Sequence, residues 1–244
     1  MRPGTPAPWS DLPEGRRRGV SVDDVRRALA ARAGRGQPTG PLDVTQGELP
    51  FHGDSRPAAV LCLLFDQDGD ANVVLTRRAA HLPAHGGEVS FPGGRMRPGE
   101  LPLQAALREA NEEVGLQPAT VEVIGQLTPL TTRFSPALVH CFVCRFDGPY
   151  AGGQALCADR SEVDRIFWVA LARLAGNGVY HEEFWPAETG AEGPGVATFR
   201  SVPFFQLEED VVWGATGRLL TELLGAVLVE GGAGGSAKGT LVES

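Results

Sequence analysis

One stretch of 23 residues, Gly94 to Leu116, constrains the fold of this chain more than any other. It reads GRMRPGELPLQAALREANEEVGL, a glycine-containing loop followed by a segment with helical periodicity. Glu109, Glu112 and Glu113 share one face of that helix, because residues three and four apart are neighbours on a helix surface. A second stripe on the same helix is apolar and consists of Leu103, Leu107, Ala110 and Val114. The sequence therefore predicts a helix over 103–114 with one acidic side and one apolar side.

The acidic side opposes two local preferences of a helix. Carboxylates four residues apart repel one another by roughly a few tenths of a kcal/mol. They also lie near the helix C-terminus, where the helix dipole disfavours anions. Local rules that are broken together usually mark a functional site, although a solvated acidic face is the alternative interpretation. Ligands that are all oxygen suit a hard divalent cation, so the pattern predicts Mg²⁺ or Mn²⁺ acting on substrate phosphates.

The spacing of the whole stretch resembles the Nudix box. The only departure is Ala110, which is smaller than the usual aliphatic residue at that position. The resemblance implies an α/β fold, an α/β/α sandwich of the Nudix type with a mixed β-sheet between helices. It also implies metal-assisted hydrolysis of a nucleoside diphosphate linked to another group, by attack of water on phosphorus. The positions that carry the resemblance are Gly94, Glu100, Arg108, Glu109, Glu112, Glu113, Gly115 and Leu116.

The same resemblance implies roles for individual residues. The metal ligands would be Glu109, Glu112 and Glu113, together with the backbone carbonyl of Gly93. Arg108 would orient a box glutamate through a charge-assisted pair. These assignments make the loop before the helix and the acidic helix face one site.

The base that activates water is left open by the sequence. Glu109 or Glu113 is possible, as is a carboxylate from a later loop. Glu162 and Asp164 are candidates for that later carboxylate, and ordinary surface positions are the alternative interpretation.

A second motif, upstream of the box, narrows the expected substrate. Leu75–Arg78, Leu82, Gly87 and Phe91–Gly94 resemble the segment that precedes the box in the coenzyme A pyrophosphatase branch, with Ala79 where Ser or Thr is usual. The resemblance implies coenzyme A or an acyl derivative as substrate, cleaved to 3′,5′-ADP and 4′-phosphopantetheine or its acyl form. ADP-ribose, NADH or an oxidised nucleotide are alternatives within the enzyme class. A non-catalytic nucleotide sensor is the alternative from another class.

The upstream motif has chemistry suited to a diphosphate. Glycines such as Gly87 and Gly94 let backbone amides approach phosphate oxygens closely. Arg77 and Arg78 end an expected strand and are predicted to bind phosphate oxygens, with a solvated strand end as the alternative. Phe91 completes the predicted substrate-binding set. Which arginine reads the 3′-phosphate of coenzyme A stays open.

Composition argues against other classes of protein. The 244 residues have a net charge of -8 and no dense basic block beyond Arg16–Arg18, which argues against a nucleic-acid partner. No apolar run approaches the ~20 residues of a membrane span. The first residues lack the apolar segment of a signal peptide. We therefore expect a cytoplasmic protein without a membrane partner, either a monomer or a homodimer.

The order of expected elements predicts one hydrolase domain with extensions. Residues 1–20, rich in Pro, Gly and Arg, are predicted to be flexible. Residues 21–56 are predicted to form a helix capped by Ser21 and then a linker. The Nudix hydrolase domain is expected over 57–229 and a flexible tail over 230–244. Strands are expected over 58–65, 71–76, 121–130, 137–146, 180–185 and 196–205, and further helices over 170–175 and 211–229.

Overall fold

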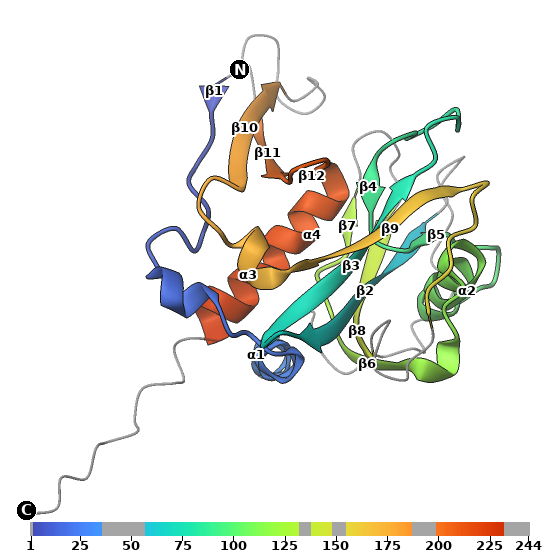
Figure 1. The fold of residues 1–244 in the computed structure, drawn as a ribbon, viewed down its shortest axis with the longest axis horizontal. Helices are drawn as coiled ribbons and strands as arrows, with labels where there is room; N and C mark the ends of the chain where they lie inside the picture. Colours follow the sequence, from blue (N-terminus) through green and yellow to red (C-terminus); the bar gives the residue numbers. More distant parts are fainter. Residues whose placement is uncertain (1, 36–56, 132–137, 148–154, 187–198, 232–244) are drawn as a thin grey trace, which may run out of the picture.

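A mixed sheet of eight strands forms the centre of the structure (Figure 1). The computed structural model describes residues 2–35, 57–131, 138–147, 155–186 and 199–231. The eight strands are β2 (Ala58–Gln67), β3 (Asp70–Arg78), β4 (Val89–Ser90), β5 (Gly93–Arg95), β6 (Val121–Gln126), β7 (Leu130–Thr131), β8 (Leu138–Phe146) and β9 (Val163–Ala170). Their order is β4-β3-β2-β8-β6, with β5 beside β2, β7 beside β8 and β9 beside β3. Strands β2 and β8 are parallel and the other pairs are antiparallel.

The sheet lies between helices on its two faces. The main helices are α1 (Val22–Gly34), α2 (Pro102–Val114) and α4 (Gly214–Leu224), and α2 lies on the opposite side of the sheet from α4 (Figure 1). Alternate residues of β2 enter two separate cores, as strand geometry requires. Leu61 and Leu63 pack with α2, whereas Cys62 and Leu64 pack with α1 and α4. The predicted α/β/α sandwich with a mixed sheet is therefore confirmed.

The local signals of the sequence set the ends of two helices. Ser21 accepts the backbone N–H of Asp24, and the Asp24 side chain accepts the backbone N–H of Ser21, a capping box that begins α1. Gly115 ends α2 with a left-handed φ of 66°. Both helices lie where the sequence predicts them. The remaining helical turns are η1 (Glu14–Arg17), η2 (Pro118–Thr120), α3 (Leu171–Leu174) and η3 (Gly225–Glu230).

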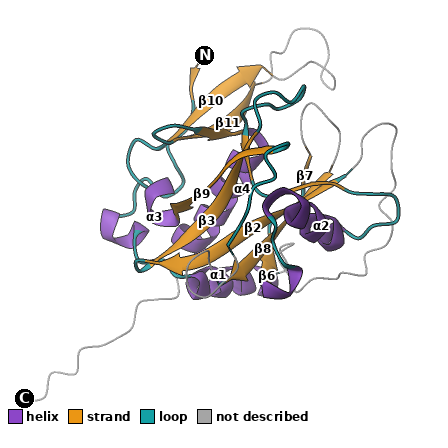
Figure 2. Cartoon of the chain, turned by 45° about the vertical axis from the view of Figure 1, so that its right-hand side comes forward, coloured by secondary structure: helices purple, strands orange, loops and turns teal. Residues whose placement is uncertain are grey.

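A second sheet covers the other side of α4. It is antiparallel, in the order β1 (Arg2–Pro3), β10 (Tyr180–Pro186), β11 (Phe199–Gln206) and β12 (Val211–Trp213). The predicted helix over 211–229 is wrong at its start, because Val211–Trp213 pairs with β11 instead. Gly214, with a φ of 65°, lets the chain turn from β12 into α4. The second sheet, α4 and the main sheet form successive layers (Figures 1 and 2).

The segment before α1 packs against this second sheet, contrary to the predicted flexibility of residues 1–20. Trp9 is 1% exposed, and its ring lies 5.3 Å from Tyr180 and 6.4 Å from Phe205. Arg17 is also buried and donates to the carbonyls of Ser10, Leu12 and Ala175 and to the Asn177 side chain. Pro and Gly content indicated a flexible segment, but burial of one large aromatic ring outweighs that composition.

Several sequence predictions concern residues outside the described ranges. These are most of the linker before β2, the connector after β7, the glycine-rich stretch after β10 and nearly all of the C-terminal tail, namely 36–56, 132–137, 187–198 and 232–244. Among the described helices, none has the length and apolar character that crossing a bilayer requires.

Trp9 provides a test of the role of the N-terminal segment. Trp9→Ala should lower the free energy of unfolding by about 3–5 kcal/mol, because a buried aromatic side chain leaves a cavity when it is truncated. Urea denaturation measures this change, with Asp11→Ala at an exposed neighbouring position as the control. Equal stability of the two variants would contradict the packing role.

Candidate active site

The acidic face of α2 lies against the glycine strand β5. Glu113 is 8% exposed, and the Gly93 backbone N–H donates to Glu113 Oε2 at 3.0 Å. Gly93 has a φ of 140°, and a Cβ there would lie 2.4 Å from the Ala59 carbonyl oxygen. Only glycine therefore lets β5 approach β2 this closely. The sequence-predicted pair of Gly93 and Glu113 is thus brought together by the strand and the helix.

Glu109 lies over the next residue of the same strand. A Cβ on Gly94 would lie 2.6 Å from Glu109 Oε2, so the absence of a side chain at Gly94 makes room for this carboxylate. The Glu109 side chain is 20% exposed and Glu112 is 50% exposed. The three glutamates therefore range from nearly buried to half exposed along one helix face.

Arg108 holds this acidic face together. Its Nη1 donates to Glu109 Oε1 at 2.7 Å and to Glu112 Oε2 at 3.1 Å. Its Nε and Nη2 bind both oxygens of Glu100 at 2.8 and 2.9 Å, and this pairing holds the pKa of Glu100 below its ordinary value. Nη2 also donates to the Arg95 carbonyl at 3.1 Å. One guanidinium thus offsets the repulsion of three carboxylates and ties α2 to the loop before it.

Burial makes Glu113 the unusual carboxylate of the set. Burial raises the pKa of Glu113 to about 7, against the stabilising N–H of Gly93. That value includes the charges of Glu109 and Glu162, which raise the pKa as burial does, and the charge of Arg78, which lowers it. The Asp159 N–H donates to the Glu113 carbonyl at 2.9 Å, and the Glu162 N–H donates to the Asp159 carbonyl at 3.0 Å, so the chain before β9 is joined to α2 at Glu113. Of the two later carboxylates that the sequence left open, Asp164 binds Arg77, whereas Glu162 lies in the segment joined to α2 and stays a candidate.

The two adjacent arginines of β3 point to opposite sides of the sheet. Leu75 enters the core on the α4 side and Val74 the core under α2, so strand alternation directs Arg78 toward α2 and Arg77 away from it. Arg77 instead binds Asp164 at 2.8 Å and Asp210 at 3.3 Å. The structure therefore does not bring Arg77 to the acidic face, in contrast to its predicted contact with phosphate. No local pattern predicts this pairing, because Asp210 lies 133 residues from Arg77 in the chain.

Two other predicted substrate contacts have different environments. Gly87, with a φ of 80°, donates its N–H to the Arg78 carbonyl at 3.0 Å and so closes the loop that follows β3. Phe91 is 1% exposed and packs in the core on the α4 side of the sheet. The Phe91 ring is covered by the protein core, so its substrate contact stays a prediction that its ring does not support.

The donor set, carboxylate oxygens beside a backbone carbonyl, fits a hard divalent cation. Among the residues that the structure describes, no three His, Cys, Asp or Glu side chains are arranged to hold a metal. Glu109 and Glu112 bind Arg108 instead, and Glu112 also binds Arg97 Nη2 at 3.1 Å. Glu113 is a nearly buried carboxylate without a cationic hydrogen-bond partner among the described contacts, and a cation beside it would offset its burial. The sequence did not anticipate the contact of Arg97 with Glu112.

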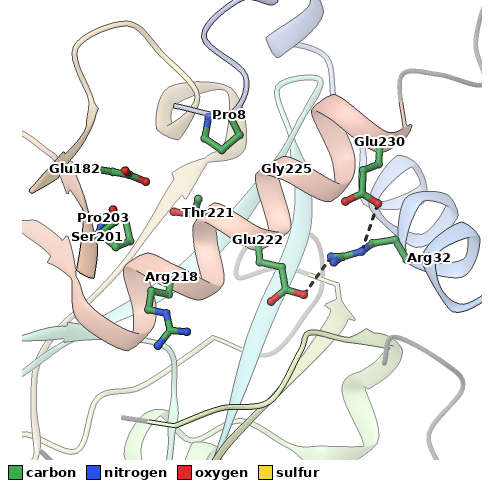
Figure 3. A pocket seen from close by; sticks show the side chains of 10 residues that line it. All are labelled: Pro8, Arg32, Glu182, Ser201, Pro203, Arg218, Thr221, Glu222, Gly225 and Glu230. Atoms are coloured by element: carbon green, nitrogen blue, oxygen red, sulfur yellow. Dashed lines mark hydrogen bonds and ion pairs between the residues drawn. The ribbon is translucent and has the colours of Figure 1, made fainter. Parts of the chain in front are cut away.

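A cavity of about 400 Å³ lies apart from these residues, along α4 between α1 and β11 (Figure 3). Arg32 lies there between Glu222 at 3.1 Å and Glu230 at 3.5 Å. No side chain of the acidic face lines this cavity. The candidate active site is therefore the loop and helix around Glu113, not this hollow.

The raised pKa of Glu113 predicts a gain in stability from removing its charge. The folded state binds the proton of Glu113 more tightly than the unfolded state, whose pKa is near 4.5. Ionisation of Glu113 therefore lowers the free energy of unfolding as pH rises from about 4.5 to about 7, on the order of 3 kcal/mol in total. In metal-free protein, Glu113→Gln should raise the Tm at pH 8 and leave it nearly unchanged at pH 4.5.

Thermal denaturation in the presence of a chelator measures both values. Glu112→Gln is the matched control, because Glu112 is half exposed and should give no gain at pH 8. A Tm of Glu113→Gln that falls at pH 8, or rises equally at both pH values, would contradict the expected burial of the charge.

Comparisons with known proteins all identify relatives in the same family. The sequence pattern of the NUDIX domain matches residues 55–187. The uncharacterized Nudix hydrolase NudL of Escherichia coli is 34% identical over 171 residues, which are 69% of this chain and 81% of that protein. Nudix hydrolase 3 of Caenorhabditis elegans is 48% identical over 75 residues, 31% of each chain.

Among solved structures, a MutT/nudix family protein from Enterococcus faecalis matches with a TM-score of 0.44 and 16% identity, over 84% of this chain and 73% of that one. The NUDIX match covers more than half of the chain and includes both motifs singled out in the sequence. The chain therefore belongs to the Nudix family, whose hydrolases act on phosphorus-containing acid anhydrides.

Proposed function

We propose that this protein hydrolyses the diphosphate linkage of coenzyme A or an acyl derivative, using Mg²⁺ or Mn²⁺. The products would be 3′,5′-ADP and 4′-phosphopantetheine or its acyl form. The observation that carries the proposal is the nearly buried Glu113, held by the Gly93 N–H on the same helix face as Glu109 and Glu112. The choice of coenzyme A rests on the motif from Leu75 to Gly94, because the box residues serve any Nudix substrate.

The proposed site divides its tasks among few side chains. Glu109, Glu112 and Glu113 would hold the cation, with the Gly93 carbonyl as a further oxygen ligand. The cation, when bound, supplies positive charge that stabilises the diphosphate in the transition state. Arg78 would bind a phosphate oxygen on the same side of the sheet.

A carboxylate must also accept a proton from the attacking water. Glu109, Glu113 and Glu162 are the candidates, since the first two share one face of α2 and Glu162 lies in the segment that is bound to the end of α2. Arg108 is a positioning residue in this proposal, because its guanidinium is bound to Glu100, Glu109 and Glu112. It keeps the carboxylates from turning away from one another.

A substrate comparison tests the activity. In the presence of Mg²⁺ or Mn²⁺, we expect the highest kcat/KM for coenzyme A or an acyl derivative, above dephospho-coenzyme A, ADP-ribose, NADH and 8-oxo-dGTP. Products are identified by mass, and reaction in ¹⁸O-water should leave the label on a phosphate, because water attacks phosphorus. Glu113→Gln should lower kcat by at least about a hundredfold through loss of a metal ligand.

Each other outcome has a defined meaning. Preference for ADP-ribose, NADH or the oxidised nucleotide would keep the hydrolase and reject coenzyme A as the substrate. No turnover of any compound would favour a nucleotide sensor, the alternative outside the enzyme class.

Arg78 gives a second test within the same assay. Arg78→Gln should raise KM by about tenfold or more, because a charge-assisted bond to a phosphate oxygen is lost. Arg173→Gln is the control, since Arg173 is exposed on α3 and pairs only with Glu208 among the described contacts. A KM unchanged in Arg78→Gln would remove Arg78 from the substrate site.

A further inference from the structure

Asp210 connects the second sheet to the main sheet next to the active site. It lies in the turn between β11 and β12, outside residues 55–187 of the family match, and its side chain is 6% exposed. Its Oδ1 accepts Arg77 Nη1 at 3.3 Å, and its Oδ2 lies 3.6 Å from Arg165 Nη1. Asp164 Oδ2 binds the same Arg77 through Nε and Nη2, both at 2.8 Å. One arginine at the end of β3 is thus held by carboxylates from two sheets.

A β-bulge lies at the same place. Arg77 pairs with Arg165, but the next residue, Arg78, pairs with Val163. Asp164 is therefore the extra residue of β9 in this antiparallel ladder. A bulge of this kind turns the side chains that flank it and is common beside active sites. Here it frees the Asp164 carboxylate to reach Arg77 rather than lie opposite Arg78.

The chain on the far side of the bulge is joined to α2 at Glu113. The Ala79 N–H donates to the Glu162 carbonyl at 2.8 Å, so the chain just after Arg78 is bound to the chain just before β9. The Glu162 N–H donates to the Asp159 carbonyl at 3.0 Å, and the Asp159 N–H donates to the Glu113 carbonyl at 2.9 Å, so this segment is in turn bound to the end of α2. The position of the Arg78 and Glu162 side chains thus depends on how β3 and β9 are joined at the bulge.

We infer that Asp210 is a positioning residue for the active site, which fixes the β3–β9 bulge through Arg77 and thereby aims Arg78 and Glu162 at Glu113. Its role in turnover rests on the proposed function, whereas its effect on the bulge does not. Arg77 and Arg165 each keep another acidic partner when Asp210 is neutralised, Asp164 and Glu209 respectively. The variant Asp210→Asn should therefore fold, with a loosened bulge.

Amide hydrogen exchange tests the bulge without any substrate. In Asp210→Asn, the exchange of the Ala79 amide should accelerate about tenfold, because its hydrogen bond to Glu162 bridges the loosened strands. The exchange rate of the Gly93 amide, which donates to Glu113, should not change. Neither β5 nor α2 contacts Asp210 in the described hydrogen bonds.

Kinetics test the effect on the site. Asp210→Asn should raise KM about tenfold through Arg78, while the Kd for Mn²⁺, measured by paramagnetic resonance, should change less than about twofold. Arg77→Gln should have the same effect, and the double variant should be no worse than either single variant, because both residues act through one contact.

Glu222→Gln is the matched control, because Glu222 is also a mostly buried acid paired with an arginine, Arg32, but lies at the cavity of Figure 3. It should leave KM and the exchange of the Ala79 amide unchanged. Wild-type exchange and KM in Asp210→Asn, or additive losses in the double variant, would overturn the inference. If the wild-type protein turns over no substrate, the proposed function fails, and the exchange of the Ala79 amide alone decides the role of Asp210.

Discussion

A carboxylate buried against a backbone amide is the constraint on which the site depends. Glu113 has little access to water, and the Gly93 N–H is its direct hydrogen-bond donor. Such a group is costly to ionise unless further positive charge approaches it. The surrounding elements leave room beside Glu113. Strand β5 has no side chains at Gly93 and Gly94, and Arg108 binds the neighbouring carboxylates of Glu109 and Glu112.

The two-residue period of a strand decides which arginine serves the site. Arg77 and Arg78 are adjacent and chemically identical, yet one is directed toward the second sheet and the other toward α2. Ion pairing then fixes the difference, since two aspartates already neutralise Arg77 and raise the pKa of its guanidinium. A substrate phosphate would have to displace those carboxylates to bind Arg77, whereas the Arg78 side chain donates only to the Ala84 carbonyl among the described hydrogen bonds.

Local patterns in the sequence predicted α1, α2 and β2 well, because caps, helical spacing and a continuous apolar run depend on neighbouring residues. The Gly93, Glu109 and Glu113 constellation was accessible for the same reason, since one loop and one helix supply it. The burial of Trp9 and Phe91 and the start of α4 were missed. Each depends on a partner far along the chain, and no short-range pattern records which strand or ring that partner will be.

The position of α4 has a consequence for how the molecule unfolds. Its apolar residues belong to the same continuous core as β2, Trp9 and the second sheet. The end of the family match at residue 187 therefore does not coincide with a folding boundary. Removing the segment beyond it would uncover the part of the central sheet that α4 covers, so the region of the family match and the segment that follows it are expected to unfold together.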